Sequence, residues 1–159
     1  MSASALTLRH TIATLAYRAS KAVRDMPAEA AVYRPSPDSR TAAEILAHMG
    51  DLFDWALSMA NGKQAWKDSK PLDEWSAECD RFFAALKKFD DRLAADEPIA
   101  CDVNRLFQGP VADALTHTGQ INILRRLAGA AVKAENYAVA KIGEGRIAPA
   151  EQAPPVREF

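Results

Sequence analysis

Apolar residues recur three or four positions apart along most of this chain, and this spacing constrains the fold more than any other feature. The clearest stretch comprises Leu72, Trp75, Cys79, Phe82, Leu86, Phe89 and Leu93. An α-helix turns once in about 3.6 residues, so these side chains fall on one helix face. Alternating steps of three and four are typical of the seam between packed helices. The pattern predicts a helix that begins near Pro71.

Three other segments carry helical spacing of the same kind. We expect helices from about Leu6 to Met26, from about Thr41 to Ala60 with Ser39 as its cap, and from Pro110 to about Gly129, with a shorter helical piece around Tyr137. No convincing strand separates them. The predicted core lines of the first two helices are Leu8, Ile12, Leu15, Ala19, Val23 and Met26, and Ile45, Met49, Leu52, Ala56 and Met59. Four amphipathic helices predict an all-α, single-domain four-helix bundle.

The length and charge of the chain indicate how many domains it forms and which partners are not expected. With 159 residues, 48% hydrophobic, it fits one globular domain, which we place at residues 1–145, followed by a proline-rich tail at 146–159 that is either disordered or an extended arm. The net charge of −1 comes with no basic stripe, so no nucleic-acid partner is expected. No apolar run is long enough for a membrane span.

Two features of the sequence indicate the cellular compartment of the protein. The first 24 residues contain Arg and Ser but no acidic residue, as organelle transit peptides do, yet they also carry a core-facing helical pattern, which favours a helix of the mature fold. Cys79 and Cys101 show no metal or redox spacing. Because Cys79 lies on an apolar face, we interpret it as a small buried side chain in a reducing compartment. These features predict a cytoplasmic protein.

Polar residues interrupt the predicted core face of the last helix. Asp113, His117 and Gln120 lie on the line that continues through Leu124 and Leu127, and we therefore expect them to point inward. A buried, unpaired carboxylate costs several kcal/mol, so something positive should meet Asp113.

A divalent metal ion would satisfy these groups together. Asp113 and His117 are four residues apart, which stacks their donor atoms on one helix face, and His48 lies beside the core line of the second helix. The alternative is a buried Asp–His hydrogen-bonded pair without metal, since the spacing alone is not specific. His10 lies nearly opposite the core line of its helix and is expected to be solvated.

Two stretches resemble the DinB-like superfamily. "SRTAAEILAHMGDLFDWAL", entered through "RPSPDSR", is similar to its second-helix signature, and "HTGQINILRRLAG" is similar to its fourth-helix signature, H-x-x-x-H-R-G-Q. The similarity extends from the first helix to Gly129. It implies an up-down-down-up bundle, often dimeric, with a nickel-, zinc- or iron-type ion held by one histidine of the second helix and two of the fourth. The matching positions are His48, Asp113 and His117.

The chain departs from this motif at two positions. Asp113 stands at the first fourth-helix histidine, and Thr118 replaces the arginine. The resemblance therefore implies a two-His-one-carboxylate site, which leaves positions open for water or substrate. Members of the superfamily are thiol-dependent transferases or metal hydrolases, which suggests a low-molecular-weight thiol as a second cofactor, a small-molecule substrate and a homodimer.

Two hypotheses follow from these observations. In the first, the chain is a metal-dependent hydrolase or thiol S-transferase, with Gln120 and Glu44 as candidate partners that orient the ligand histidines and Trp55 as a candidate lining residue. In the second, it is a non-catalytic, small-molecule-binding or stress-associated bundle whose metal site has been lost.

Overall fold

The computed structural model describes residues 3–159, and its regular secondary structure is entirely helical in that range. The long helices are α1 (Ala3–Val23), α3 (Ala42–Ala60), α4 (Trp75–Ala94) and α6 (Ala112–Leu127). The short elements are α2 (Ala28–Ala31), α5 (Val103–Leu106), the π-helical turn η1 (Phe107–Val111) and the 3-10 turns η2 (Tyr137–Val139) and η3 (Pro149–Glu151). The prediction of an all-α single domain is confirmed, as is the helical piece at Tyr137.

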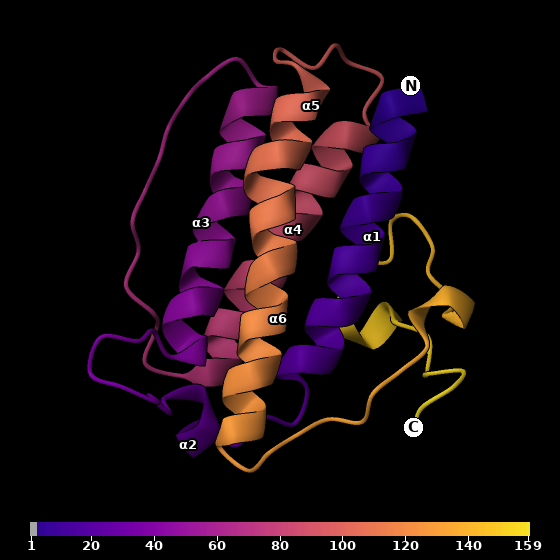
Figure 1. Cartoon of the computed structure of the whole chain (residues 1–159). Helices are drawn as coiled ribbons and strands as arrows, with labels where there is room; N and C mark the ends of the chain where they lie inside the picture. The colour runs from indigo at the N-terminus through magenta and orange to yellow at the C-terminus, as the bar shows by residue number, and fades with distance from the viewer. Residues whose placement is uncertain (1–2) are drawn as a thin grey trace.

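The long helices lie side by side around one core. α4 contacts both α1 and α3, and α6 contacts the same two helices from the other side. In Figure 1, α1 and α6 run downward while α3 and α4 run upward. The parallel direction of α3 and α4 requires residues 61–74 to return along the full length of α3, where Figure 1 shows them as an extended segment at the outer edge.

The predicted core lines are largely buried. Every predicted core residue of the first two helices is buried, although α1 ends at Val23 rather than Met26, and on α4 the stripe from Phe82 to Leu93 is buried as well. The prediction is wrong at its start, because Leu72 is 45% exposed and α4 begins at Trp75 rather than near Pro71. The Leu72 backbone N–H donates to Glu78 Oε2 at 2.8 Å, so this segment is held extended against the helix.

The start of α3 is fixed by a capping box. The Thr41 hydroxyl accepts from the Glu44 N–H at 3.1 Å, and Glu44 Oε2 accepts from the Thr41 N–H at 2.7 Å. Ser39, the predicted cap, instead donates to the Ser36 carbonyl at 2.7 Å within the preceding turn. The cap therefore lies two residues later than expected, because only Thr41 has a glutamate three residues ahead that can return the hydrogen bond.

The segment after α6 is an ordered arm on α1. Lys21, 5% exposed, lies 2.7 Å from Glu135 Oε2 and 2.8 Å from Glu158 Oε1, and Glu135 pairs with Glu158 in an isolated antiparallel bridge. Ile147 is fully buried within the main core. Of the two alternatives for the tail, the structure shows the extended arm, and the hydrophobic core continues past residue 145.

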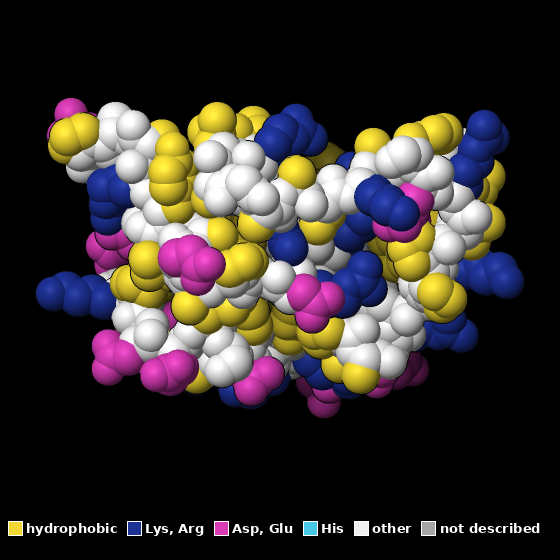
Figure 2. Space-filling view, turned by 90° about the horizontal axis from the view of Figure 1, so that it is seen from below, with side chains coloured by type: hydrophobic (Ala, Val, Ile, Leu, Met, Phe, Trp, Pro, Cys, Tyr) yellow, Lys and Arg dark blue, Asp and Glu magenta, His cyan; other side chains and the backbone are white. Residues whose placement is uncertain are grey.

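The end of the molecule that carries α2 and the last turn of α6 has a mixed surface. Figure 2 shows hydrophobic side chains there, interspersed with basic and acidic ones. No helix of residues 3–159 has the length and apolar character needed to span a membrane.

Candidate metal centre

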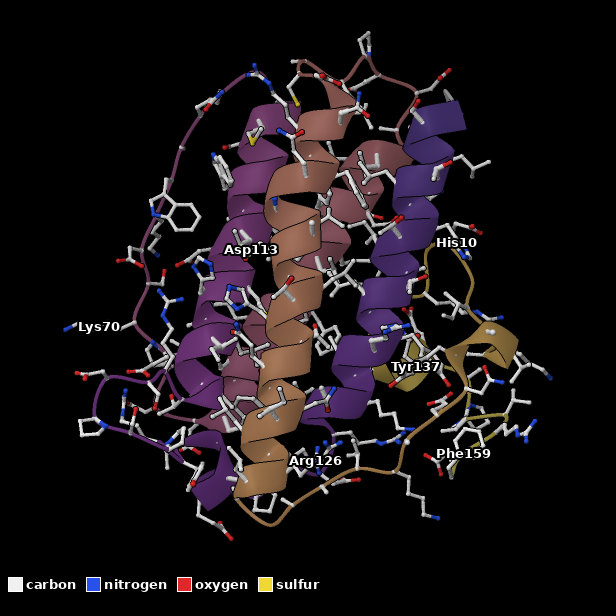
Figure 3. The ribbon with its side chains drawn as sticks, in the orientation of Figure 1. His10, Lys70, Asp113, Arg126, Tyr137 and Phe159 are labelled. Atoms are coloured by element: carbon white, nitrogen blue, oxygen red, sulfur yellow. The ribbon has the colours of Figure 1, made fainter. Side chains whose placement is uncertain are left out.

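The three predicted metal ligands come together between α3 and α6. His48 lies in the second turn of α3, while Asp113 and His117 lie in the first two turns of α6, which packs against α3. In Figure 3, Asp113 lies where the two helices face each other. The side chains of His117 and His48 are 12% and 20% exposed, and that of Asp113 is 45% exposed.

Asp113 bridges the two imidazole rings. His48 Nε2 lies 3.3 Å from Asp113 Oδ2, and His117 Nε2 lies 3.3 Å from Asp113 Oδ1. The two rings are perpendicular, with centroids 5.0 Å apart. One donor atom from each residue lies within 4.8 Å of the other two. Small side-chain rotations would therefore suffice to close the three donors around one ion.

The separations have the values expected for ligands of one ion, and one of them also meets the criteria of a hydrogen bond. Metal–ligand bonds of about 2.0–2.1 Å in a tetrahedral arrangement separate neighbouring donor atoms by roughly 3.3 Å. Hydrogen bonds between an imidazolium and a carboxylate are shorter, at about 2.7–2.9 Å. His48 Nε2 lies 3.3 Å from Asp113 Oδ2, within hydrogen-bonding distance, and His117 Nε2 lies 3.3 Å from Oδ1, so both separations equal those of ligands around one ion.

Gln120 orients the His117 ring. Its Oε1 lies 2.7 Å from His117 Nδ1, one turn further along α6. In the neutral tautomer in which Nδ1 donates to this oxygen, Nε2 presents a lone pair toward Asp113. In that tautomer Nε2 and Asp113 Oδ1, 3.3 Å apart, are both acceptors, an arrangement that a shared cation satisfies. This pairing is what the sequence analysis expected of Gln120.

Glu44 does not contact His48, the ligand histidine that it was expected to orient. Its oxygens accept from the Thr41 N–H and from Arg34 Nη2, the latter at 2.8 Å. The backbone hydrogen bond at Thr41, followed by the Arg34 contact, lowers the Glu44 pKa below its ordinary value. Glu44 therefore stabilises the helix start one turn before His48, and its oxygens are engaged there rather than with the imidazole.

The face of α6 that packs into the core also differs from the prediction. Ala114, Thr118, Ile121, Leu124 and Arg125 are buried. Gln120 and Leu127, which were expected to point inward, are exposed, Leu127 by 57%. The triad therefore lies along the margin of the helix pair and opens to solvent, instead of lying inside the core.

α6 is turned in this way because the neighbouring face of the helix packs into the core. Ala114 and Thr118 are small and bring α6 close to its neighbours, and the Thr118 hydroxyl is satisfied by the Ala114 carbonyl at 2.9 Å. The Arg125 guanidinium donates to the carbonyls of Ala22 and Arg24 at the end of α1, at 2.9 and 2.7 Å. An arginine can thus be buried when backbone carbonyls accept its hydrogens.

An aromatic wall that the sequence analysis did not identify covers His48. Trp66 belongs to the extended segment after α3, and its ring centroid lies 5.6 Å from that of His48 and 5.8 Å from that of Trp55. Trp55 was a candidate lining residue. Trp66 escaped notice because it lies outside any periodic pattern; the only signal was a large aromatic residue within the polar stretch "NGKQAWKDSK".

Buried ion pairs hold this segment against α3. Asp51 is 1% exposed; its Oδ2 accepts from the Ser69 N–H at 2.6 Å and its Oδ1 lies 3.1 Å from Arg81. Arg81 also contacts Glu78, which is fully buried, at 2.9 Å. A Cβ at position 50 would lie 3.0 Å from the Arg81 guanidinium carbon, so Gly50 makes room for this network.

Comparison of the chain with protein-family models, curated proteins and solved structures finds no match. Its function is therefore inferred from the geometry of the site.

Two cavities adjoin the triad. The larger, of about 470 Å³, includes His117 and Gln120 in its lining, and the smaller, of about 270 Å³, includes His48. Arg40 lines both. The site can thus combine an ion held by two imidazoles and one carboxylate with space for a small molecule beside it.

Proposed function

We propose that the chain binds a divalent metal ion of the zinc, nickel or iron type through His48, Asp113 and His117, and that this ion is the centre of a small-molecule enzyme. The observation that carries the proposal is the convergence of one donor atom from each residue within 4.8 Å, with a Gln120 contact at Nδ1 that keeps Nε2 of His117 directed into the group.

The helix arrangement gives further support. The up-down-down-up order that the DinB-like resemblance implies agrees with the directions of α1, α3, α4 and α6 in Figure 1. The three donors come from the two helices that the resemblance assigns. We therefore propose a DinB-like four-helix bundle in which Asp113 has replaced a histidine ligand.

The donor set suits a catalytic ion. Two imidazoles and one carboxylate form a ligand set that leaves coordination positions for water or substrate, where a divalent ion acts as a Lewis acid. Asp113 adds a negative charge that moderates the acidity of the centre. Gln120 keeps the His117 ring in orientation, and Trp66, which packs on Trp55, contacts the His48 ring from the other side. We propose a hydrolase or a thiol-dependent transferase as the enzyme class.

The test is metal analysis of the protein purified without added metal, followed by titration with zinc, nickel and ferrous ions. We expect one ion per chain in the wild type and loss of the ion in His117→Ala, with the helical circular dichroism spectrum retained. His10→Ala is the matched control, because His10 is 56% exposed and pairs with Glu144 away from the site.

A chelator experiment separates the proposal from the non-catalytic alternative. An ion that binds the folded state adds stability, so its removal should lower the melting temperature of the wild type and leave that of His117→Ala unchanged. Equal melting temperatures with and without chelator, together with substoichiometric metal, would instead establish a direct Asp113–histidine hydrogen-bonded group.

A further inference from the structure

The larger cavity beside the triad is a groove with one apolar side. Ile123, Leu124 and Leu127 of α6 and Ile45 of α3 line it, and His117 and Gln120 lie at its border with the metal site. Ile123 and Leu127 are 56% and 57% exposed, although they lie on a helix that has a well-packed opposite face. Its volume of about 470 Å³ falls in the range of small-molecule sites, about 300–1,000 Å³.

Arg40 gives this groove its charge. Among the described residues that line it, Arg40 is the one with a permanent charge. The neighbouring Arg34 is already paired with Glu44, whereas no carboxylate of residues 3–159 forms an ion pair with Arg40. The Ser39 hydroxyl donates to the Ser36 carbonyl, so the donors that line the groove come from the Arg40 guanidinium and the Gln120 amide.

The smaller cavity does not share this preference. There Arg34, Arg40 and Lys70 are accompanied by Asp38, Glu44 and Asp68, so charges of both signs are balanced. Lys70 also extends away from the triad in Figure 3. An anion beside the metal site would therefore be recognised by Arg40 from the apolar groove.

We infer that the ligand of this groove is a small monocarboxylic acid with an aliphatic or aromatic body. Its carboxylate pairs with Arg40, and its body lies on Ile123, Leu124 and Leu127, which directs one end toward His117. A guanidinium fork matches a carboxylate through two parallel hydrogen bonds, and the single charge of Arg40 balances one carboxylate, whereas a phosphate monoester carries up to two negative charges. That this ligand is the substrate rests on the proposed metal-dependent function.

The test uses octanoate as the probe and the full chain, first with chelator and then with one equivalent of zinc, in isothermal titration calorimetry. We expect the metal-free protein to bind octanoate, because the groove and Arg40 do not require the ion. Arg40→Gln should weaken binding about fivefold to tenfold, the loss expected for a partly exposed charged pair. Arg126→Gln, on the exposed last turn of α6 and outside the groove lining (Figure 3), should leave it unchanged.

Octylammonium provides the charge control. It has the same chain length with the opposite charge, so the wild type should prefer octanoate and Arg40→Gln should lose that preference. Ile123→Ser, at an exposed position, should weaken both probes. Failure of octanoate to bind, or equal binding by wild type and Arg40→Gln, would overturn the inference.

Two further outcomes are distinguishable. If sedimentation velocity shows a dimer that Ile123→Ser dissociates, the groove is covered by a second copy of the chain and the inference is wrong. Metal analysis of the same samples tests the metal proposal separately. Octanoate binding by a protein that takes up no zinc would refute the metal centre and keep the groove assignment. Zinc uptake without octanoate binding would keep the metal centre and refute the groove assignment.

Discussion

His117 and Gln120 lie one turn apart on α6, and the hydrogen bond between their side chains decides which ring nitrogen faces Asp113. The 2.7 Å contact at Nδ1 leaves Nε2 as the donor atom toward the other two ligands. A carboxamide that fixes a ring in this way lowers the entropic cost of metal binding, since the ring is already in its bound orientation.

Gln120→Leu removes this hydrogen bond at an exposed position and keeps the approximate volume of the side chain. We expect affinity for zinc to fall about tenfold to a hundredfold, as for other groups that orient metal ligands. Competition with a chromophoric chelator measures the change. Thr116→Ala, on the exposed side of α6, is the control. Unchanged affinity in Gln120→Leu would mean that packing alone orients His117.

At the scale of helices, the start of α3 determines where His48 lies. The capping box of Thr41 and Glu44 begins the helix one turn before His48, and Arg34 adds an ion pair to the same glutamate. These contacts lower the Glu44 pKa, with the backbone hydrogen bond at Thr41 as the largest cause.

Glu44→Ala should lower the free energy of unfolding by about 1 kcal/mol at pH 7, the usual value of a helix cap. Because the folded-state pKa lies below the ordinary value of 4.5, the contribution is present above that pH and disappears as the pH falls through the lowered pKa. Urea unfolding of wild type and variant from pH 7 to pH 3 should therefore converge. Asp54→Ala, exposed in the middle of α3, should show no such convergence.

The pairing of α3 with α4 depends on Arg81. Its guanidinium is the partner of two carboxylates that are almost fully buried, Asp51 and Glu78. The same carboxylates accept backbone N–H groups of Ser69 and Leu72, which hold the extended segment that carries Trp66.

Arg81→Met should cost about 3 kcal/mol, because it leaves two buried carboxylates without their cation. Lys87→Met, which removes an exposed pair with Asp91, should change stability by less than about 1 kcal/mol. Urea unfolding measures both. A loss for Arg81→Met as small as that for Lys87→Met would show that backbone hydrogen bonds suffice for the two carboxylates.

In the whole molecule, the C-terminal arm completes the surface of α1. Tyr17 and Lys21 of α1 hold Glu135, whose side chain is fully buried, and Tyr17 donates to it at 2.5 Å. Burial, followed by this hydrogen bond, raises the Tyr17 pKa above its ordinary value. Ile147 then inserts into the core.

Ile147→Ala should lower the free energy of unfolding by about 2–4 kcal/mol, because a fully buried isoleucine leaves a cavity when truncated. Val156→Ala, 51% exposed on the same arm, should have little effect. Thermal and urea unfolding measure the difference. Similar stability of the two variants would mean that the arm docks through its ion pairs alone.

Helical periodicity by itself determined the all-α class, the core lines of α1 and α3 and most of α4. A helix that buries one face needs an apolar residue every three or four positions, and this spacing is visible in the sequence. The same spacing brought Asp113 and His117 together as neighbours on one helix, and placed His48 on another. Tertiary packing decided how α6 is turned, since small residues and Arg125 bury a face that periodicity alone does not select. It also decided that Trp66 covers His48 and that Arg40 lies beside the apolar groove, because both belong to irregular segments whose positions depend on contacts distant in sequence.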